Sequence, residues 1–132
     1  MLGNKVEEFP IELLPYTIDK PYNLDELTAE VIDEMFNGNY EDFTISWTDE
    51  PCKDIYGMFY KGIEKDKIVI NSLLNSSQVQ PEVIKYIIYH EMLHRSMRYH
   101  DDAFRREEHK YPNYTEWERV LDHQLLNYKF EW

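Results

Sequence analysis

The segment that most constrains the fold of this chain runs from His90 to His94 and reads His-Glu-Met-Leu-His. Successive residues of an α-helix turn by about 100°, so on one helix His94 returns to within roughly 40° of His90, one turn further along. Both imidazoles can then reach a common ion at about 2.0–2.1 Å, and Glu91 lies on the adjoining flank. The spacing therefore predicts a helix that carries a zinc site.

A third histidine, His100, follows His94 by six residues. On the same straight helix its Cα would lie about 9 Å further along the axis, so the helix must end near residues 97–99 and the chain must turn back. Three histidines around one Zn²⁺ leave the fourth tetrahedral position open, as in catalytic zinc sites. Glu91 could then act on a water there without binding the ion itself.

The neighbours of the motif predict that this helix is central and buried. Buried histidine and glutamate are costly unless they are paired or bound to metal, which disfavours a surface helix with two solvated histidines. Apolar residues occupy most of the helix surface and leave only a narrow polar face; they are Val83, Ile84, Ile87, Ile88, Met92 and Leu93.

Acidic residues beyond the motif have several possible roles. Glutamate on a following helix is another known third ligand, so Glu107 or Glu108 is an alternative to His100. Asp101, Asp102 or Glu116 could orient a ligand imidazole through its second nitrogen, although we expect Asp101 to cap a helix. A tyrosine could stabilise the negative charge that develops on the substrate oxygen, but the sequence does not single one out. The candidates are Tyr60, Tyr99, Tyr111 and Tyr114.

Length and composition bound the rest of the chain. Its 132 residues predict one domain, residues 23–132, after an extended arm at residues 1–22, which holds three prolines. The 26 acidic and 14 basic residues give a net charge of −12, which disfavours direct binding of nucleic acid because phosphate contacts need clustered Lys and Arg. The single cysteine, Cys52, permits no intramolecular disulfide, and we expect a cytoplasmic protein without a membrane segment.

Hydrophobic periodicity and capping residues predict an α+β domain with an N-terminal helix, a three-stranded antiparallel sheet, the central helix and two C-terminal helices. The expected elements are a helix capped by Asn23 and closed by Gly38, strands at 43–48, 55–61 and 67–71, a central helix from Pro81, a helix between Asp101 and Pro112, and a last helix from Asn113 through Trp117, Leu121, Leu125 and Tyr128.

The chain resembles the SprT-like zinc metallopeptidases over roughly residues 25–128. The specific part of the resemblance is the motif from His90 to His94 with His100 and Phe104 in step; the strand matches, such as Ile68 to Asn71, are weaker. The resemblance implies a compact zincin-like fold and one Zn²⁺ held by His90, His94 and His100. It also implies Glu91 as catalytic acid and base, and a peptide or protein substrate.

Some features depart from that family or leave other interpretations open. Many members carry a four-cysteine zinc ribbon, which this chain lacks, and members directed to DNA need a basic surface. The histidine spacing also matches metzincins, but those have glycine at the position of Met97. A zinc-stabilised binding module with an acidic docking surface is the alternative function, and a protein ligand such as Cys52 in the fourth position would favour it. The arm at residues 1–22 could be autoinhibitory, and the sequence does not indicate an oligomeric state.

Overall fold

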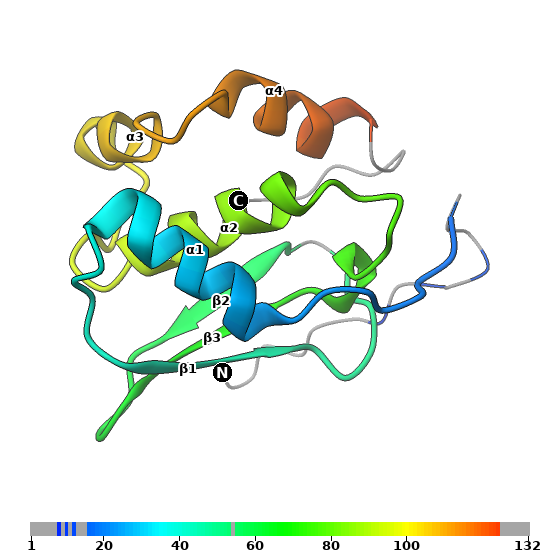
Figure 1. The fold of residues 1–132 in the computed structure, drawn as a ribbon, viewed down its shortest axis with the longest axis horizontal. Coiled ribbons are helices and arrows are strands. Elements are labelled where there is room, and N and C mark those ends of the chain that lie inside the picture. Colours follow the sequence, from blue (N-terminus) through cyan, green and yellow to red (C-terminus); the bar gives the residue numbers. More distant parts are fainter. Residues whose placement is uncertain (1–7, 9, 11, 13–15, 54, 125–132) are drawn as a thin grey trace.

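The structure is a computed structural model that describes residues 8, 10, 12, 16–53 and 55–124. Within this part the elements are α1 (Leu24–Phe36), β1 (Phe43–Trp47), β2 (Gly57–Tyr60), β3 (Asp66–Ile70), the 3₁₀ turn η2 (Ser72–Leu74), α2 (Pro81–Leu93), α3 (Asp102–Glu108), α4 (Tyr114–Arg119) and the π-helical turn η3 (Val120–Gln124). The α+β class expected from the sequence is confirmed, with the helices packed on and beyond a small sheet (Figure 1).

The sheet is mixed, not antiparallel throughout as predicted. Its strand order is β1-β3-β2, and β2 and β3 form the expected antiparallel hairpin. β1, however, pairs with β3 in parallel, with Ile45 opposite Ile68 and Trp47 opposite Ile70. This register sets the half-buried apolar side of β1 beside the buried residues of β3. Alternation in the sequence indicated which face of β1 is buried but carried no information about its partner strand.

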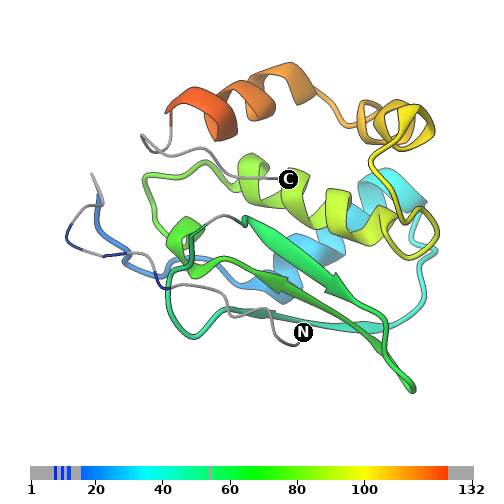
Figure 2. The ribbon, with the colours of Figure 1, turned by 180° about the vertical axis from the view of Figure 1, so that it is seen from behind.

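α2 lies at the centre of the molecule. Figures 1 and 2 show α1 and α2 side by side over the sheet, with α3 and α4 beyond α2 on the side away from the strands. Every residue from Val83 to Leu93 is buried, as predicted for the central helix. Even Lys85 is buried, and its Nζ lies 3.0 Å from carboxylate oxygens of both Glu30 and Glu34 on α1. No helix in the described part of the chain is long and apolar enough to cross a membrane.

α2 ends earlier than expected, at Leu93 instead of near residues 97–99. The N–H of His94 donates to the carbonyl of Glu91 at 3.1 Å, a tightened last turn. The hydroxyl of Tyr40 donates to the carbonyl of Met92 at 2.7 Å, which satisfies a backbone group that a longer helix would have used. His94 is therefore the C-cap of α2, and residues 94–96 continue as a turn.

The outer helices follow the predicted caps in part. The side chain of Asn23 caps α1, and that of Asp101 caps α3 by accepting from the N–H of Phe104 at 3.0 Å. α3 ends at Glu108, ahead of Pro112, where it was expected to stop. Asn113, from which the last helix was expected to start, precedes α4 with a φ of 60° and makes no side-chain capping bond. Leu125 and Tyr128, predicted for the last helix, lie outside the described residues.

The described end of the predicted arm, residues 16–22, has no helix or strand and packs against the loop that precedes α2. The hydroxyl of Tyr16 donates to the carbonyl of Leu73 at 2.8 Å, and the hydroxyl of Ser76 donates to the carbonyl of Thr17 at 2.7 Å. The arm's remaining residues, apart from 8, 10 and 12, lie outside the described part. The prediction of a separate arm therefore stays a prediction.

Candidate metal centre

The structure brings His90, His94 and His100 together at the C-terminal end of α2. One ring nitrogen from each lies within 4.8 Å of the corresponding nitrogens of the other two. His90 comes from the last turn of α2, His94 caps the helix, and His100 comes from the loop that turns back toward α3. The turn is held by the N–H of Met97, which donates to the carbonyl of Leu93 at 3.0 Å.

Phe104 forms the floor on which the three imidazoles rest. Its ring centroid lies 4.9 Å from that of His90, 4.7 Å from that of His94 and 5.0 Å from that of His100, and the side chain is fully buried. Because Asp101 caps α3 through the N–H of Phe104, the start of α3 fixes both the floor and the neighbouring His100. Helix capping thus contributes directly to the geometry of the cluster.

Hydrogen bonds at Nδ1 orient the imidazole rings of His90 and His94. His90 Nδ1 lies 2.5 Å from Glu108 Oε2, and His94 Nδ1 donates to the carbonyl of Met97 at 2.8 Å. A carbonyl or an ionised carboxylate can only accept, so both Nδ1 atoms carry the proton and both Nε2 atoms present lone pairs toward the cluster. Such carboxylate or carbonyl partners are the usual outer shell of metal-binding histidines.

The cluster fits a single metal ion. The Nε2 atoms of His94 and His100 lie 3.0 Å apart, and two nitrogens bound to a tetrahedral ion at about 2.0–2.1 Å would lie roughly 3.4 Å apart. Burial lowers the pKa of His94 and lowers that of His100 to about 4, so both rings are neutral at pH 7, as ligands must be. Lone pairs that face each other at this separation are favourable only around a cation or a shared proton.

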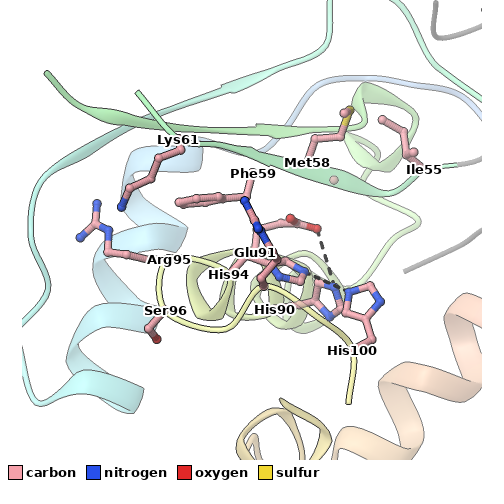
Figure 3. Close-up of a pocket in the computed structure, with 12 residues that line it drawn as sticks. Ile55, Met58, Phe59, Lys61, His90, Glu91, His94, Arg95, Ser96 and His100 are labelled. Carbon is pink, nitrogen blue, oxygen red and sulfur yellow. Dashed lines mark hydrogen bonds and ion pairs between the residues drawn. The ribbon is translucent and has the colours of Figure 1, made fainter. Parts of the chain in front are cut away.

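Glu91 lies beside the cluster on the wall of a cleft. Its Oε2 lies 3.9 Å from His90 Nε2, and its side chain is almost wholly buried. Burial raises the pKa of Glu91 to about 7, with the charge of Glu108 a smaller contribution in the same direction. Gly57 of β2 makes room for it, because a Cβ at that position would lie only 3.1 Å from Glu91 Cγ. The cleft holds about 670 Å³ between β2, the end of α2 and the loop to His100 (Figure 3).

Four of the other predicted acidic residues have partners in the structure, and all but Asp101 have partners that differ from the predicted ones. Glu108 faces the Nδ1 side of His90, the ring edge opposite the other histidines, and Glu107 pairs with Lys110 at 2.8 Å. Asp101 caps α3, and Glu116 pairs with Arg119. The role of orienting an imidazole therefore falls to Glu108, which sequence reasoning considered only as a ligand.

A helical signal could have found Glu108. It follows Phe104 by four residues and so shares its helix face, and Phe104 was already matched to the motif. The carboxylate is completely buried, and Arg105 Nη1 donates to its Oε1 at 2.7 Å. Although burial acts to raise it, hydrogen bonds from His90 and Arg105 hold the pKa of Glu108 below its usual value, so the residue is ionised at pH 7.

Cys52 and the candidate tyrosines do not join the site. Cys52 is buried, its Sγ donates to the carbonyl of Glu50 at 3.2 Å, and it is not part of the histidine cluster. The candidate tyrosines do not line the cleft; the four concerned are Tyr60, Tyr99, Tyr111 and Tyr114.

A protein-family model matches part of the chain. The family model described as YgjP-like, metallopeptidase domain, matches residues 60–124, which include the whole histidine cluster, Glu91, Phe104 and Glu108. Comparison with curated proteins and with solved structures gave no match. Membership of a metallopeptidase family implies a metal ion, and the three histidines form a group that can hold one. Residues 60–124 thus form a metallopeptidase domain of the YgjP-like family, which confirms the resemblance to SprT-like metallopeptidases drawn from the sequence.

Proposed function

We propose that this protein is a zinc-dependent metallopeptidase in which His90, His94 and His100 hold the ion and Glu91 is the general base and acid. The observation that carries the proposal is the convergence of three imidazoles beside a buried glutamate at an open cleft. Three nitrogen ligands with a cleft at the fourth side are the arrangement of a catalytic zinc site, whereas structural sites are closed by a fourth protein ligand.

The residues of the chain divide the chemistry between them. Zinc supplies Lewis acidity, which makes water more acidic at neutral pH and polarises a peptide carbonyl. Glu91 accepts a proton from the attacking water and passes it to the leaving amine, because it lies beside the cluster without belonging to it. Glu108 and the carbonyl of Met97 keep His90 and His94 in the tautomer that a metal needs.

The decisive experiment compares the wild-type protein with Glu91→Gln on an unfolded protein substrate, with zinc content measured in both. Loss of general acid–base catalysis predicts a fall of about 10²–10⁴-fold in turnover with zinc still bound. Glu82→Gln is the matched control, because Glu82 is exposed in the first turn of the same helix.

Two outcomes would contradict the proposal. Turnover that survives Glu91→Gln with zinc bound would remove Glu91 from the mechanism. Stoichiometric zinc in a wild-type protein that hydrolyses no peptide bond would favour the zinc-stabilised binding module instead.

A further inference from the structure

The cleft beside the histidines has a charge opposite to that of the whole molecule. Acidic residues outnumber basic ones by 26 to 14 along the chain. Of the described residues that line the cleft, three are Lys or Arg and one, the buried Glu91, is acidic. The cationic residues are Lys61, Arg95 and Arg98. A local reversal of this kind suggests that the cleft selects its ligand by charge.

Two of the cationic residues lie away from the aliphatic residues of the cleft. In Figure 3, Lys61 and Arg95 lie at one end, while Ile55 and Met58 lie toward the other, on the side of His100. Gly57 packs against Glu91, and Lys61 follows it by four residues, directly after the end of β2 at Tyr60. At about 3.3 Å per residue, Lys61 is roughly 13 Å from Gly57 along an extended backbone. An extended peptide in the cleft would thus meet positive charge three or four residues from Glu91.

The three cations differ in how far the protein already uses them. Arg95 is committed: its Nε donates to Asp66 at 2.8 Å and its guanidinium lies 4.4 Å from the ring centroid of Tyr40. Lys61 is 70% exposed and lies 3.7 Å from the same carboxylate. Arg98 is exposed, and it has no ion pair within the described part of the chain. Asp66 offsets one of the two positive charges of Lys61 and Arg95, and Arg98 adds a further positive charge to the lining of the cleft.

Two acidic residues border this end of the cleft, because the guanidinium of Arg95 donates to the backbone carbonyls of Glu41 at 3.0 Å and of Asp42 at 3.2 Å. The carboxylate of Asp42 pairs with Lys65 at 3.1 Å. The acidic residues of α1 lie on a helix that packs against α2 and β1, whereas the cleft lies along β2 at the opposite edge of the sheet. Charges separated by more than about 8 Å are largely screened at physiological ionic strength. The acidic residues of α1 therefore contribute little to the charge that a ligand meets at Lys61 or Arg98.

We propose that the cleft selects peptide segments with an acidic side chain three or four residues from the scissile bond, held by Lys61, while Arg98 adds positive charge to the same cleft and an apolar side chain packs against Ile55 and Met58 on the other side. This inference rests on the proposed function, because it takes a peptide as the occupant of the cleft. Exposed charge pairs are individually weak, so two of them together give about a three- to tenfold preference for the acidic peptide.

The test measures peptide binding without hydrolysis. Zinc-loaded Glu91→Gln protein is titrated, with fluorescence anisotropy as the readout, against a labelled unfolded peptide that carries glutamates at one end, its glutamine counterpart and its lysine counterpart. The glutamate peptide is expected to bind tightest, by about three- to tenfold over glutamine, with an advantage that shrinks as salt is raised. Arg98→Glu and, separately, Lys61→Glu should remove the preference.

Arg106→Glu is the matched control. It changes the net charge by the same amount, but Arg106 is exposed on α3 and does not line the cleft, so the preference should persist. Equal binding of the three peptides, or a preference that survives both cleft variants in folded protein, would overturn the proposal. So would an oligonucleotide that binds more tightly than the glutamate peptide and depends on Arg98.

These outcomes are separable from failure of the proposed function. Charge-selective binding by a wild-type protein that cleaves nothing would reject the peptidase and keep the acidic ligand. Hydrolysis of unfolded protein without any charge preference would do the reverse.

Discussion

Replacing Glu108 by glutamine tests the role of the carboxylate that orients His90. Both of its oxygens accept: Oε2 from His90 Nδ1 at 2.5 Å and Oε1 from Arg105 Nη1 at 2.7 Å. A glutamine of the same shape has one oxygen and one NH₂ group, so a donor must face a donor at one of the two positions. If the NH₂ group faces His90, the imidazole must move its proton to Nε2, the atom that faces the other histidines.

The magnitude follows from the cost of losing that partner. Removing an outer-shell partner of a metal-binding histidine typically weakens metal affinity by about 10–100-fold, which corresponds to roughly 1.4–2.7 kcal/mol. Stability of the metal-free chain is a poorer readout, because glutamine also removes the desolvation cost of a fully buried carboxylate. Zinc affinity therefore measures how well Glu108 orients His90, separately from its effect on stability.

The assay is competition for zinc against a chelator of known affinity, with circular dichroism to establish that each variant is folded. Glu108→Gln should bind zinc about 10–100-fold more weakly than the wild-type protein. Glu107→Gln, one residue earlier on α3, should bind as the wild-type protein does, because Glu107 pairs with Lys110 and does not touch the cluster. A folded Glu108→Gln variant with unchanged zinc affinity would refute the orienting role.

Two further predictions concern Glu91. A Cβ added by Gly57→Ala would lie 3.1 Å from Glu91 Cγ and 3.2 Å from its Oε2, so the displaced carboxylate should lower turnover about tenfold while zinc affinity stays unchanged; unchanged turnover would contradict this. Burial raises the pKa of Glu91 from 4.5 to about 7, so the folded chain holds this proton more tightly than the unfolded chain. Ionised Glu91 therefore costs stability progressively as pH rises between these values, up to about 3 kcal/mol. With metal removed by a chelator, Glu91→Gln protein should be more stable to urea than wild-type protein above about pH 7, and the difference in stability should close toward about pH 4.5. A stability difference that does not change with pH would contradict this prediction.

Local sequence patterns predicted the parts of the fold that local physics decides. Asn23 and Asp101 cap helices because a side-chain oxygen near a free N–H is favourable whatever the rest of the chain does. The buried circumference of α2 followed from its uninterrupted apolar residues. The parallel pairing of β1 with β3 was missed, because partner choice depends on how the loop between β1 and β2 crosses the sheet, which strand alternation does not encode.

The site, like the fold, was predicted from the sequence where local spacing decides its geometry. The motif spacing and the turn required for His100 predicted a cluster that the geometry brings together. At the end of α2, however, the carbonyl of Met92 accepts from the hydroxyl of Tyr40, a residue distant in sequence. The spacing of Glu108 from Phe104 places both residues on one face of α3, but the contact of Glu108 with His90 depends on how α3 packs against α2. Long-range contacts thus account for what sequence reasoning missed.

The division of the site between α2 and α3 links metal binding to folding. α3 has seven residues, and a helix this short is not stable by itself in water. Yet its first turn and its last residue supply Phe104 and Glu108, and His100 directly precedes its cap. An ion bound by His100 and by the histidines of α2 would therefore hold the start of α3 in place, and α3 in turn would hold His90 in its ligand tautomer through Glu108. On this argument the metal and the third helix stabilise each other, whereas α2, buried along almost its whole length, needs neither.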